Sequence, residues 1–171
     1  MVEYRRSVCS SGVEVSYFWH ACQKWEDHVE AAVEALMDAI RAPGRLWNPW
    51  VVASARGAFK SRIKRACAGE LQPVDEIKHI DGAHPAELFE IRWQDIGVID
   101  RVPTGERRHE IPVRLLHAEP SHLSLTVIGL HAHEKVVHPE DSRRTREAQD
   151  AEVEVACQTY WTVIQTPWGF R

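Results

Sequence analysis

The stretch Glu87-Leu-Phe-Glu-Ile-Arg-Trp93 begins the part of the sequence that decides the fold, and this part continues to Lys135. Two further segments of the same kind follow it, Ile111-Pro-Val-Arg-Leu-Leu-His-Ala118 and Leu123-Ser-Leu-Thr-Val-Ile-Gly-Leu-His-Ala-His133. All three are rich in the branched and aromatic residues that β-strands favour. The linker Glu119-Pro-Ser-His122 is short enough to join the second and third segments as a hairpin. The sequence therefore predicts an antiparallel sheet of three to four strands.

Alternation along these strands sorts the side chains onto two faces. In the first strand it separates two sets, Phe89, Ile91 and Trp93 on one face and Leu88, Glu90 and Arg92 on the other. In the second strand it separates His117 from Arg114, and the end of the third carries His131, His133 and Lys135 on a single face. A sheet that brings Arg92, Arg114 and Lys135 to one surface would form a pocket for phosphate.

Helical periodicity occurs both before and after these strands in the sequence. Apolar residues recur at helical spacing from Trp25 to Arg41. A second helix is predicted from Ser54, as its N-cap, to Ala68. A final helix is predicted after Ser142, with Pro167 as its stop. The order of elements predicts an α+β domain with helices packed on the sheet.

The remaining segments are less regular. The charged segment 94–110 contains Pro103-Thr-Gly105 and is predicted to be an exposed loop. Residues 1–24 are predicted as an N-terminal extension in which Val13–Trp19 can form a short strand, and residues 25–171 as one domain.

The composition is typical of a globular protein. Of 171 residues, 44% are hydrophobic and 27% are charged. No apolar run is long enough to span a membrane, and the N-terminus lacks the apolar segment of a signal peptide. We therefore expect a cytoplasmic protein with no membrane partner. The four cysteines form no CxxC pair, which predicts free thiols: Cys9, Cys22, Cys67 and Cys157.

Charge is distributed unevenly along the chain. The net charge of −4 argues against a general cationic coat for nucleic acid. From Ala39 to Gly69, however, seven residues are basic and none is acidic. Five of them lie on the second predicted helix and are candidate RNA-binding residues: Arg56, Lys60, Arg62, Lys64 and Arg65.

Several phrases within the predicted strands are similar to motifs of one protein family. Leu88-Phe-Glu-Ile-Arg92 fits the pattern L-(W/F)-E-(L/I)-R, and Val113-Arg-Leu-Leu-His117 fits the arginine-containing strand that follows it. Val127-Ile-Gly-Leu-His-Ala-His-Glu-Lys135 fits the last strand, and Ile77-Lys-His-Ile-Asp-Gly82 resembles the lead-in to the first. Over about residues 26–160 the chain thus resembles the RelE/HigB superfamily of bacterial toxins, and within it the phage-associated, HigB-like branch.

The resemblance implies a RelE-like fold, with two N-terminal helices, the antiparallel sheet and a C-terminal helix. It also implies cleavage of mRNA on the ribosome without metal or cofactor, by attack of the ribose 2′-OH on the adjacent phosphate. The expected partner is a helix-turn-helix antitoxin. Arg92, Arg114 and Lys135 are the residues expected to stabilise the phosphorane charge, and His117 and His131 are candidate proton carriers.

Two alternatives remain open. Val136, in place of a second lysine, and the acidic net charge favour a non-catalytic binding or inhibitory protein of the same fold. His131 and His133 share a strand face and would suit a metal-dependent hydrolase, with His117 as a third ligand if the hairpin register allows.

Overall fold

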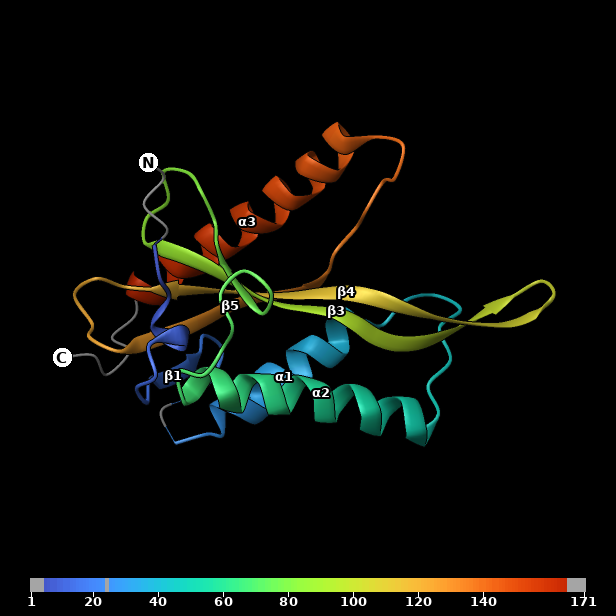
Figure 1. The fold of residues 1–171 in the computed structure, drawn as a ribbon, viewed down its shortest axis with the longest axis horizontal. Helices are drawn as coiled ribbons and strands as arrows, with labels where there is room; N and C mark the ends of the chain where they lie inside the picture. The colour runs from blue at the N-terminus through green and yellow to red at the C-terminus, as the bar shows by residue number, and fades with distance from the viewer. Residues whose placement is uncertain (1–4, 24, 166–171) are drawn as a thin grey trace.

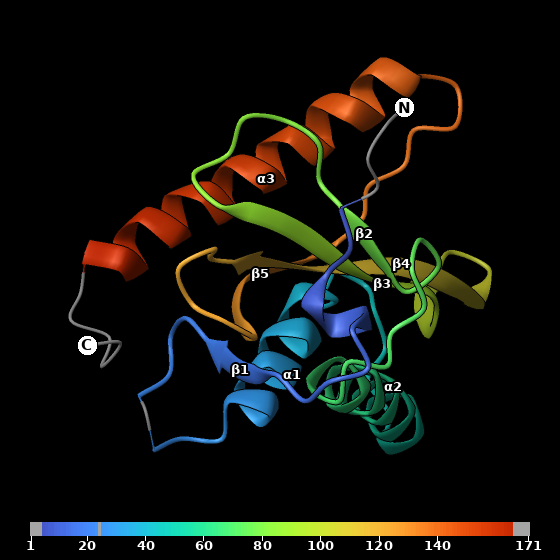
Figure 2. The same cartoon turned by 60° about the vertical axis from the view of Figure 1, so that its left-hand side comes forward.

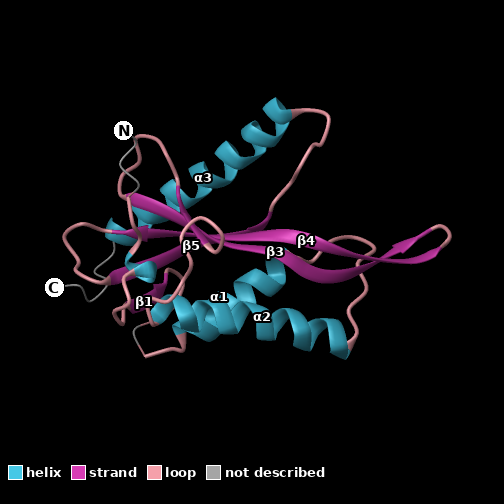
Figure 3. Cartoon of the chain, in the orientation of Figure 1, coloured by secondary structure: helices cyan, strands magenta, loops and turns pink. Residues whose placement is uncertain are grey.

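The computed structural model describes residues 5–23 and 25–165. The elements, in chain order, are a 3₁₀ turn η1 (Val8–Ser10), β1 (Ser16–Trp19), α1 (His28–Ala39), α2 (Pro49–Cys67), β2 (Ile77–His79), β3 (Glu87–Val102), β4 (Gly105–Glu119), β5 (Thr126–Glu134) and α3 (Ser142–Gln165). The class is α+β, as predicted, but a strand precedes the two helices (Figure 3). None of the described helices is both long and apolar enough to cross a membrane.

One mixed sheet contains all five named strands, in the order β1-β5-β4-β3-β2. β1 runs parallel to β5, and the other neighbouring strands are antiparallel. The prediction of a purely antiparallel sheet of three to four strands is therefore wrong in strand number and direction. The parallel strand comes from the segment predicted as an extension, and its four residues are too few to show a period that identifies a sheet partner.

The sheet is the middle of three layers. Helices α1 and α2 lie side by side on one face, and α3 crosses the other (Figures 1 and 2). The predicted alternation of β3 and β4 is confirmed, because Ile91 and Leu115 join the core that includes α1 and α2 whereas Leu88 and Leu116 join the core that includes α3. On the α1–α2 side, Trp93 meets the ring of Phe59 edge-to-face at 5.3 Å.

The long β3–β4 hairpin projects beyond the helices (Figure 1). The prediction of an exposed loop over residues 94–110 is wrong, because this segment forms the outer half of both strands, which we call the arm. The alternating residues Ile96 and Val98 are buried, and a β-bulge between Trp93 and Ile96 accompanies the change of register. The bulge interrupts the period-two pattern after Trp93, and the many charged residues of segment 94–110 further conceal it.

A network of charges centred on Arg45 holds the arm against the segment between α1 and α2. The Arg45 side chain is 5% exposed and donates hydrogen bonds to Asp100 at 3.0 Å and to Glu134 at 2.7 Å. It also donates to the main-chain oxygen of Ile40 at the end of α1. The guanidinium thus joins β3 to β5, and the second oxygen of Asp100 lies 2.6 Å from Nε2 of His109 on β4.

The helix boundaries follow local capping chemistry. α2 begins at Pro49, not after Ser54 as predicted, because the Asn48 side chain accepts a hydrogen bond from the main-chain N–H of Val51. α3 begins at Ser142 as predicted. Pro167, its expected stop, lies outside the described residues.

Candidate functional site

Three of the predicted site residues lie together on the face of the sheet that α3 crosses. Arg92 pairs directly with Arg114 across β3 and β4, and Arg114 pairs with His133 across β4 and β5. Lys135 follows immediately after β5, and its main-chain N–H donates to Pro112 of β4 at 2.8 Å. We call Arg92, Arg114 and Lys135 the cation cluster.

Arg114 lies at the back of this cluster, with its side chain only 1% exposed. It donates to the main-chain oxygens of Trp93 at 2.9 Å and Val113 at 2.8 Å, and to the Gln94 side chain at 3.1 Å. Its Nε lies 3.7 Å from the carboxylate of Glu90. Burial lowers the pKa of Arg114 to about 10, against the opposing influence of Glu90. Arg114 therefore acts through its field and its contacts rather than by touching a solvent-borne ligand.

Arg92 and Lys135 are the more accessible members. The Arg92 side chain is 19% exposed; its Nε lies 3.3 Å from Glu90, and it donates to the main-chain oxygen of Val74 at 2.6 Å. Partial burial, and then the positive charge of Arg114, lower the pKa of the Lys135 amine, while Glu90 acts in the opposite direction. A lowered pKa gives Lys135 a larger neutral fraction than an exposed lysine has, as proton transfer requires.

Beside the cation cluster lie two histidines of β5 and one carboxylate of α3. His131 Nε2 is 2.5 Å from an oxygen of Glu152, and the rings of His131 and His133 stack with centroids 5.5 Å apart. The Nδ1 atom of His133 is buried without a hydrogen-bond partner. Burial lowers the pKa of His133 to about 4, so its imidazole is neutral near pH 7. We call His131, His133 and Glu152 the His–Glu cluster.

His117 is not part of this assembly. Its ring is fully buried and stacks on Phe89, which belongs to the core on the α1–α2 side of the sheet. The structure therefore places His131 on the sheet face of the cation cluster, stacked on His133, but does not place His117 there, either as a proton carrier or as a third metal ligand. The side-chain alternation that separates His117 from Arg114 in the sequence is the reason.

His117 instead joins a second group of polar residues, formed with the N-terminal segment. Its Nε2 lies 3.1 Å from Glu119, whose carboxylate also accepts hydrogen bonds from the Ser7 hydroxyl and from the main-chain N–H of Val8. One ligand atom each from Cys9, His117 and Glu119 lie within 4.8 Å of one another. Burial raises the pKa of the Cys9 thiol far above its ordinary value, so the thiol is protonated at neutral pH.

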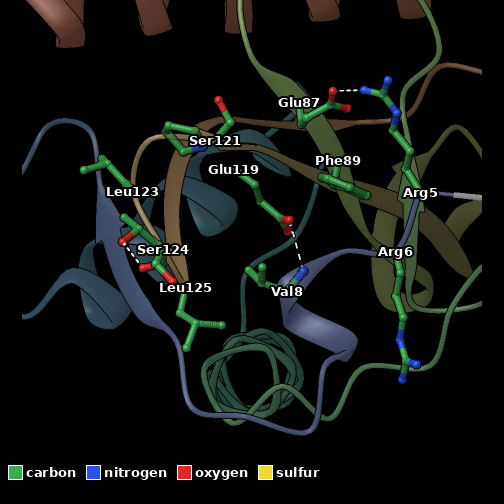
Figure 4. Close-up of a pocket in the computed structure, with 12 residues that line it drawn as sticks. Arg5, Arg6, Val8, Glu87, Phe89, Glu119, Ser121, Leu123, Ser124 and Leu125 are labelled. Atoms are coloured by element: carbon green, nitrogen blue, oxygen red, sulfur yellow. Dashed lines mark hydrogen bonds and ion pairs between the residues drawn. The ribbon is translucent and has the colours of Figure 1, made fainter.

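This second group borders a pocket of about 550 Å³ at the Glu87–Glu119 end of the β3–β4 pair. Figure 4 shows Glu119 directed toward Val8, and Glu87 paired with Arg5 at the rim. Sequence reasoning missed Cys9 and Glu119 as neighbours, because no local pattern joins them.

The basic residues of α2 are mostly committed to ion pairs within the chain. Arg56 and Lys60 contact Glu30 of α1, and Arg65 contacts Glu76. Arg62 donates to the main-chain oxygen of Arg92 and lies over the ring of Trp93, 5.6 Å from its centroid. Among the five candidate RNA-binding residues, Lys64 is the one left exposed on the described surface. The helix therefore offers RNA fewer available cations than its sequence suggests.

No family model, curated protein or solved structure matches this chain.

Proposed function

We propose that this chain is an RNA-cleaving toxin of the kind that the RelE/HigB resemblance implies, acting on mRNA at the ribosome. The observation that carries the proposal is the cation cluster: Arg92 and Arg114 are cross-strand partners, and Lys135 lies within their field on the same face of the sheet as the His–Glu cluster. Cleavage by the 2′-hydroxyl needs cationic groups around the phosphate. It also needs two further groups that transfer protons. The α3-facing side of the sheet supplies both kinds.

In the reaction, a bond forms between the ribose 2′-oxygen and phosphorus, and the bond from phosphorus to the 5′-oxygen breaks. Lys135, in its neutral form, accepts the proton of the 2′-hydroxyl. His131, oriented by Glu152 at 2.5 Å, donates a proton to the leaving 5′-oxygen. The products are a 2′,3′-cyclic phosphate and a 5′-hydroxyl, and no metal is required.

The two arginines have different parts in this scheme. Arg92, at 19% exposure, reaches the phosphate and stabilises the charge that develops on it. Arg114, at 1% exposure, stays behind the cluster and helps to keep the pKa of Lys135 low. Arg114 is therefore a positioning residue, whereas Arg92, Lys135 and His131 are the proposed catalytic residues.

Induced expression in a bacterial host tests this function. We expect wild type to arrest growth and to produce new 5′ ends inside translated messages, as mapped by primer extension. Arg92→Ala should abolish both effects, because loss of one charge-stabilising donor costs roughly 3 kcal/mol, or about two orders of magnitude in rate. Lys135→Ala should do the same, because it removes the proposed general base, which contributes about two to four orders of magnitude. Arg41→Ala is the charge-matched control, since this exposed arginine pairs only with Asp38 on the described surface. Normal growth and intact messages with abundant, folded wild type would contradict the proposal.

A non-catalytic binding protein of the same fold is the second candidate. The burial of Arg114 and the internal ion pairs of α2 favour it, because both reduce the positive charge available to RNA. Purified protein that binds a short RNA, or an antitoxin-like partner, and leaves the RNA uncut would support this candidate. A neutralising helix-turn-helix protein belongs to the toxin proposal and is tested by co-purification from cells that express both chains. A cytoplasmic location also belongs to the toxin proposal and is tested by cell fractionation.

A further inference from the structure

The His–Glu cluster combines ligands from two elements that are distant in the sequence. His131 and His133 project from alternate positions of β5, so their side chains share one face of the sheet, and Glu152 comes from α3 above them. One nitrogen of each imidazole and one carboxylate oxygen lie within 4.8 Å of one another. In a tetrahedral zinc site with bonds of about 2.0–2.1 Å, ligand atoms are roughly 3.4 Å apart. Small side-chain rotations therefore suffice to close this set around an ion.

An ion pair between His131 and Glu152 explains only part of the arrangement. The contact accounts for one nitrogen of His131, but His133 stacks on the neighbouring ring and keeps a buried Nδ1 atom without a partner. Buried polar atoms in folded proteins almost always have a partner. A metal ion held by both rings and by Glu152 would bring the second imidazole into the same set of contacts.

The cluster is also reachable from solvent. The side chains of His131 and Glu152 are 24% and 33% exposed. An ion can enter without unfolding of the core, and a fourth position remains for water or for an anionic ligand. The nearby positive charges of Arg114 and Lys135, partly balanced by Glu90, weaken cation binding but favour an anion at that fourth position.

We propose that His131, His133 and Glu152 bind one divalent transition-metal ion, with zinc as the best fit to two imidazoles and one carboxylate. The ion ties α3 to β5. The proposal concerns metal binding alone and holds whether or not the chain cleaves RNA. Within the toxin proposal it has a corollary, because zinc on His131 removes that residue as a proton donor and would inhibit cleavage.

The buried group of Cys9, His117 and Glu119 is the competing site within the chain. Cys9 and His117 are fully buried, and the Glu119 carboxylate already accepts from Ser7 and Val8. An ion there would have to displace those contacts and reach two ligands that are fully buried. The His–Glu cluster is partly exposed, and an ion there replaces only the His131–Glu152 contact with bonds to the same two groups, which is why the proposal assigns the ion to it.

Zinc binding to the tag-free, full-length chain, stripped of metal with a chelator, tests the proposal. Titration in competition with a chromogenic chelator gives affinity and stoichiometry, and thermal unfolding with and without zinc reports the link between α3 and the sheet. We expect one equivalent bound and a higher Tm in wild type. His133→Gln and Glu152→Gln should each weaken binding by roughly 100-fold and remove the rise in Tm. Glu152→Gln changes a partly exposed helix residue and so separates ligand loss from misfolding.

Two control variants sharpen the result. His122→Gln removes an exposed histidine from the loop before β5 and should bind zinc as wild type does. Cys9→Ser should also leave the affinity unchanged. Three results would overturn the proposal: no binding by wild type, equal affinity in wild type and both cluster variants, or a loss confined to Cys9→Ser. None of these results depends on nuclease activity. Failure of the metal proposal is therefore distinguishable from failure of the toxin proposal, which is tested by growth and by primer extension.

Discussion

Replacement of Arg114 by methionine tests whether a buried cation in the cation cluster stabilises the fold. The side chain is 1% exposed, and its charge lies 3.7 Å from Glu90 and across from Arg92. Methionine has a similar length, no charge and enough flexibility to fill the same space. The substitution Arg114→Met therefore removes the charge and leaves the packing largely in place.

The size of the effect follows from two opposing contributions. A pKa that falls from 12.5 to about 10 on folding corresponds to about 3 kcal/mol against the charged form in the folded protein. Methionine removes that penalty, but it also removes the hydrogen bonds to Trp93, Val113 and Gln94, each worth about 1 kcal/mol. We therefore expect the free energy of unfolding of Arg114→Met to lie within about 1 kcal/mol of wild type.

Urea unfolding followed by tryptophan fluorescence measures this difference, provided that the m-value is unchanged. Leu116→Ala is the control on the same strand, because Leu116 is 1% exposed and its truncation should cost about 2–5 kcal/mol. A loss of more than about 2 kcal/mol in Arg114→Met would refute the reasoning and make the Glu90–Arg114 pair a net stabiliser. If the variant keeps its stability and loses cleavage, Arg114 serves the site rather than the fold.

Three further predictions concern the arm, a helix end and the core. Burial acts to raise the pKa of Asp100, but the hydrogen bonds to His109 and Arg45 outweigh burial and lower this pKa below 3.8. The stabilising contribution of the Asp100 carboxylate is therefore present above pH 3.8 and is lost as pH falls through the lowered pKa. Asp100→Asn should lower the free energy of unfolding by about 1–2 kcal/mol at pH 7 in urea unfolding, and its stability should decline less steeply than that of wild type below pH 4. Gly69→Ala should cost about 2 kcal/mol or more, because Gly69 has φ +72° and an added Cβ would collide with the main-chain oxygen of Val13; an unchanged Tm would contradict this. Phe59→Ala should lower the free energy of unfolding by about 3–5 kcal/mol in urea unfolding, since the Phe59 ring is fully buried against Trp93. A loss under about 1 kcal/mol would show that the contact between α2 and the sheet is not the main core.

Much of the sheet could be predicted because its signal is local. The alternation in Leu88–Trp93 correctly assigned residues to the two faces, and all three predicted strands exist, although β3 and β4 extend beyond the predicted segments into the arm. The alternation resumes at Ile96 and Val98 after a β-bulge that shifts its phase, and this shift, the interspersed charges and Pro103-Thr-Gly105 led to a loop prediction. A strand edge that projects from the body tolerates charged residues on both sides, so composition alone does not distinguish it from a loop.

The candidate site was predictable in part for the same reason. Alternation assigned Arg92 and Arg114 each to one face of its own strand, and the pairing of β3 with β4 puts them on the same surface. The predicted cationic face of α2 is largely neutralised in the structure, because its cations form ion pairs with carboxylates of other segments, such as Glu30 and Glu76. Charge periodicity identifies a face of a helix but not what packs against it.

The sequence by itself determined the α+β class, the two faces of β3 and β4, and the start of α3, since each depends on residues within a few positions of one another. Only the tertiary structure decided that β1 lies beside β5, that Glu152 meets His131, and that Ser7 and His117 meet at Glu119. Ser7 and Glu119 are 112 residues apart in the chain, and Glu152 and His131 are 21 apart. Contacts of this kind depend on strand register and on how helices cross the sheet, which are set by packing of the whole chain and leave no periodic trace in any one segment.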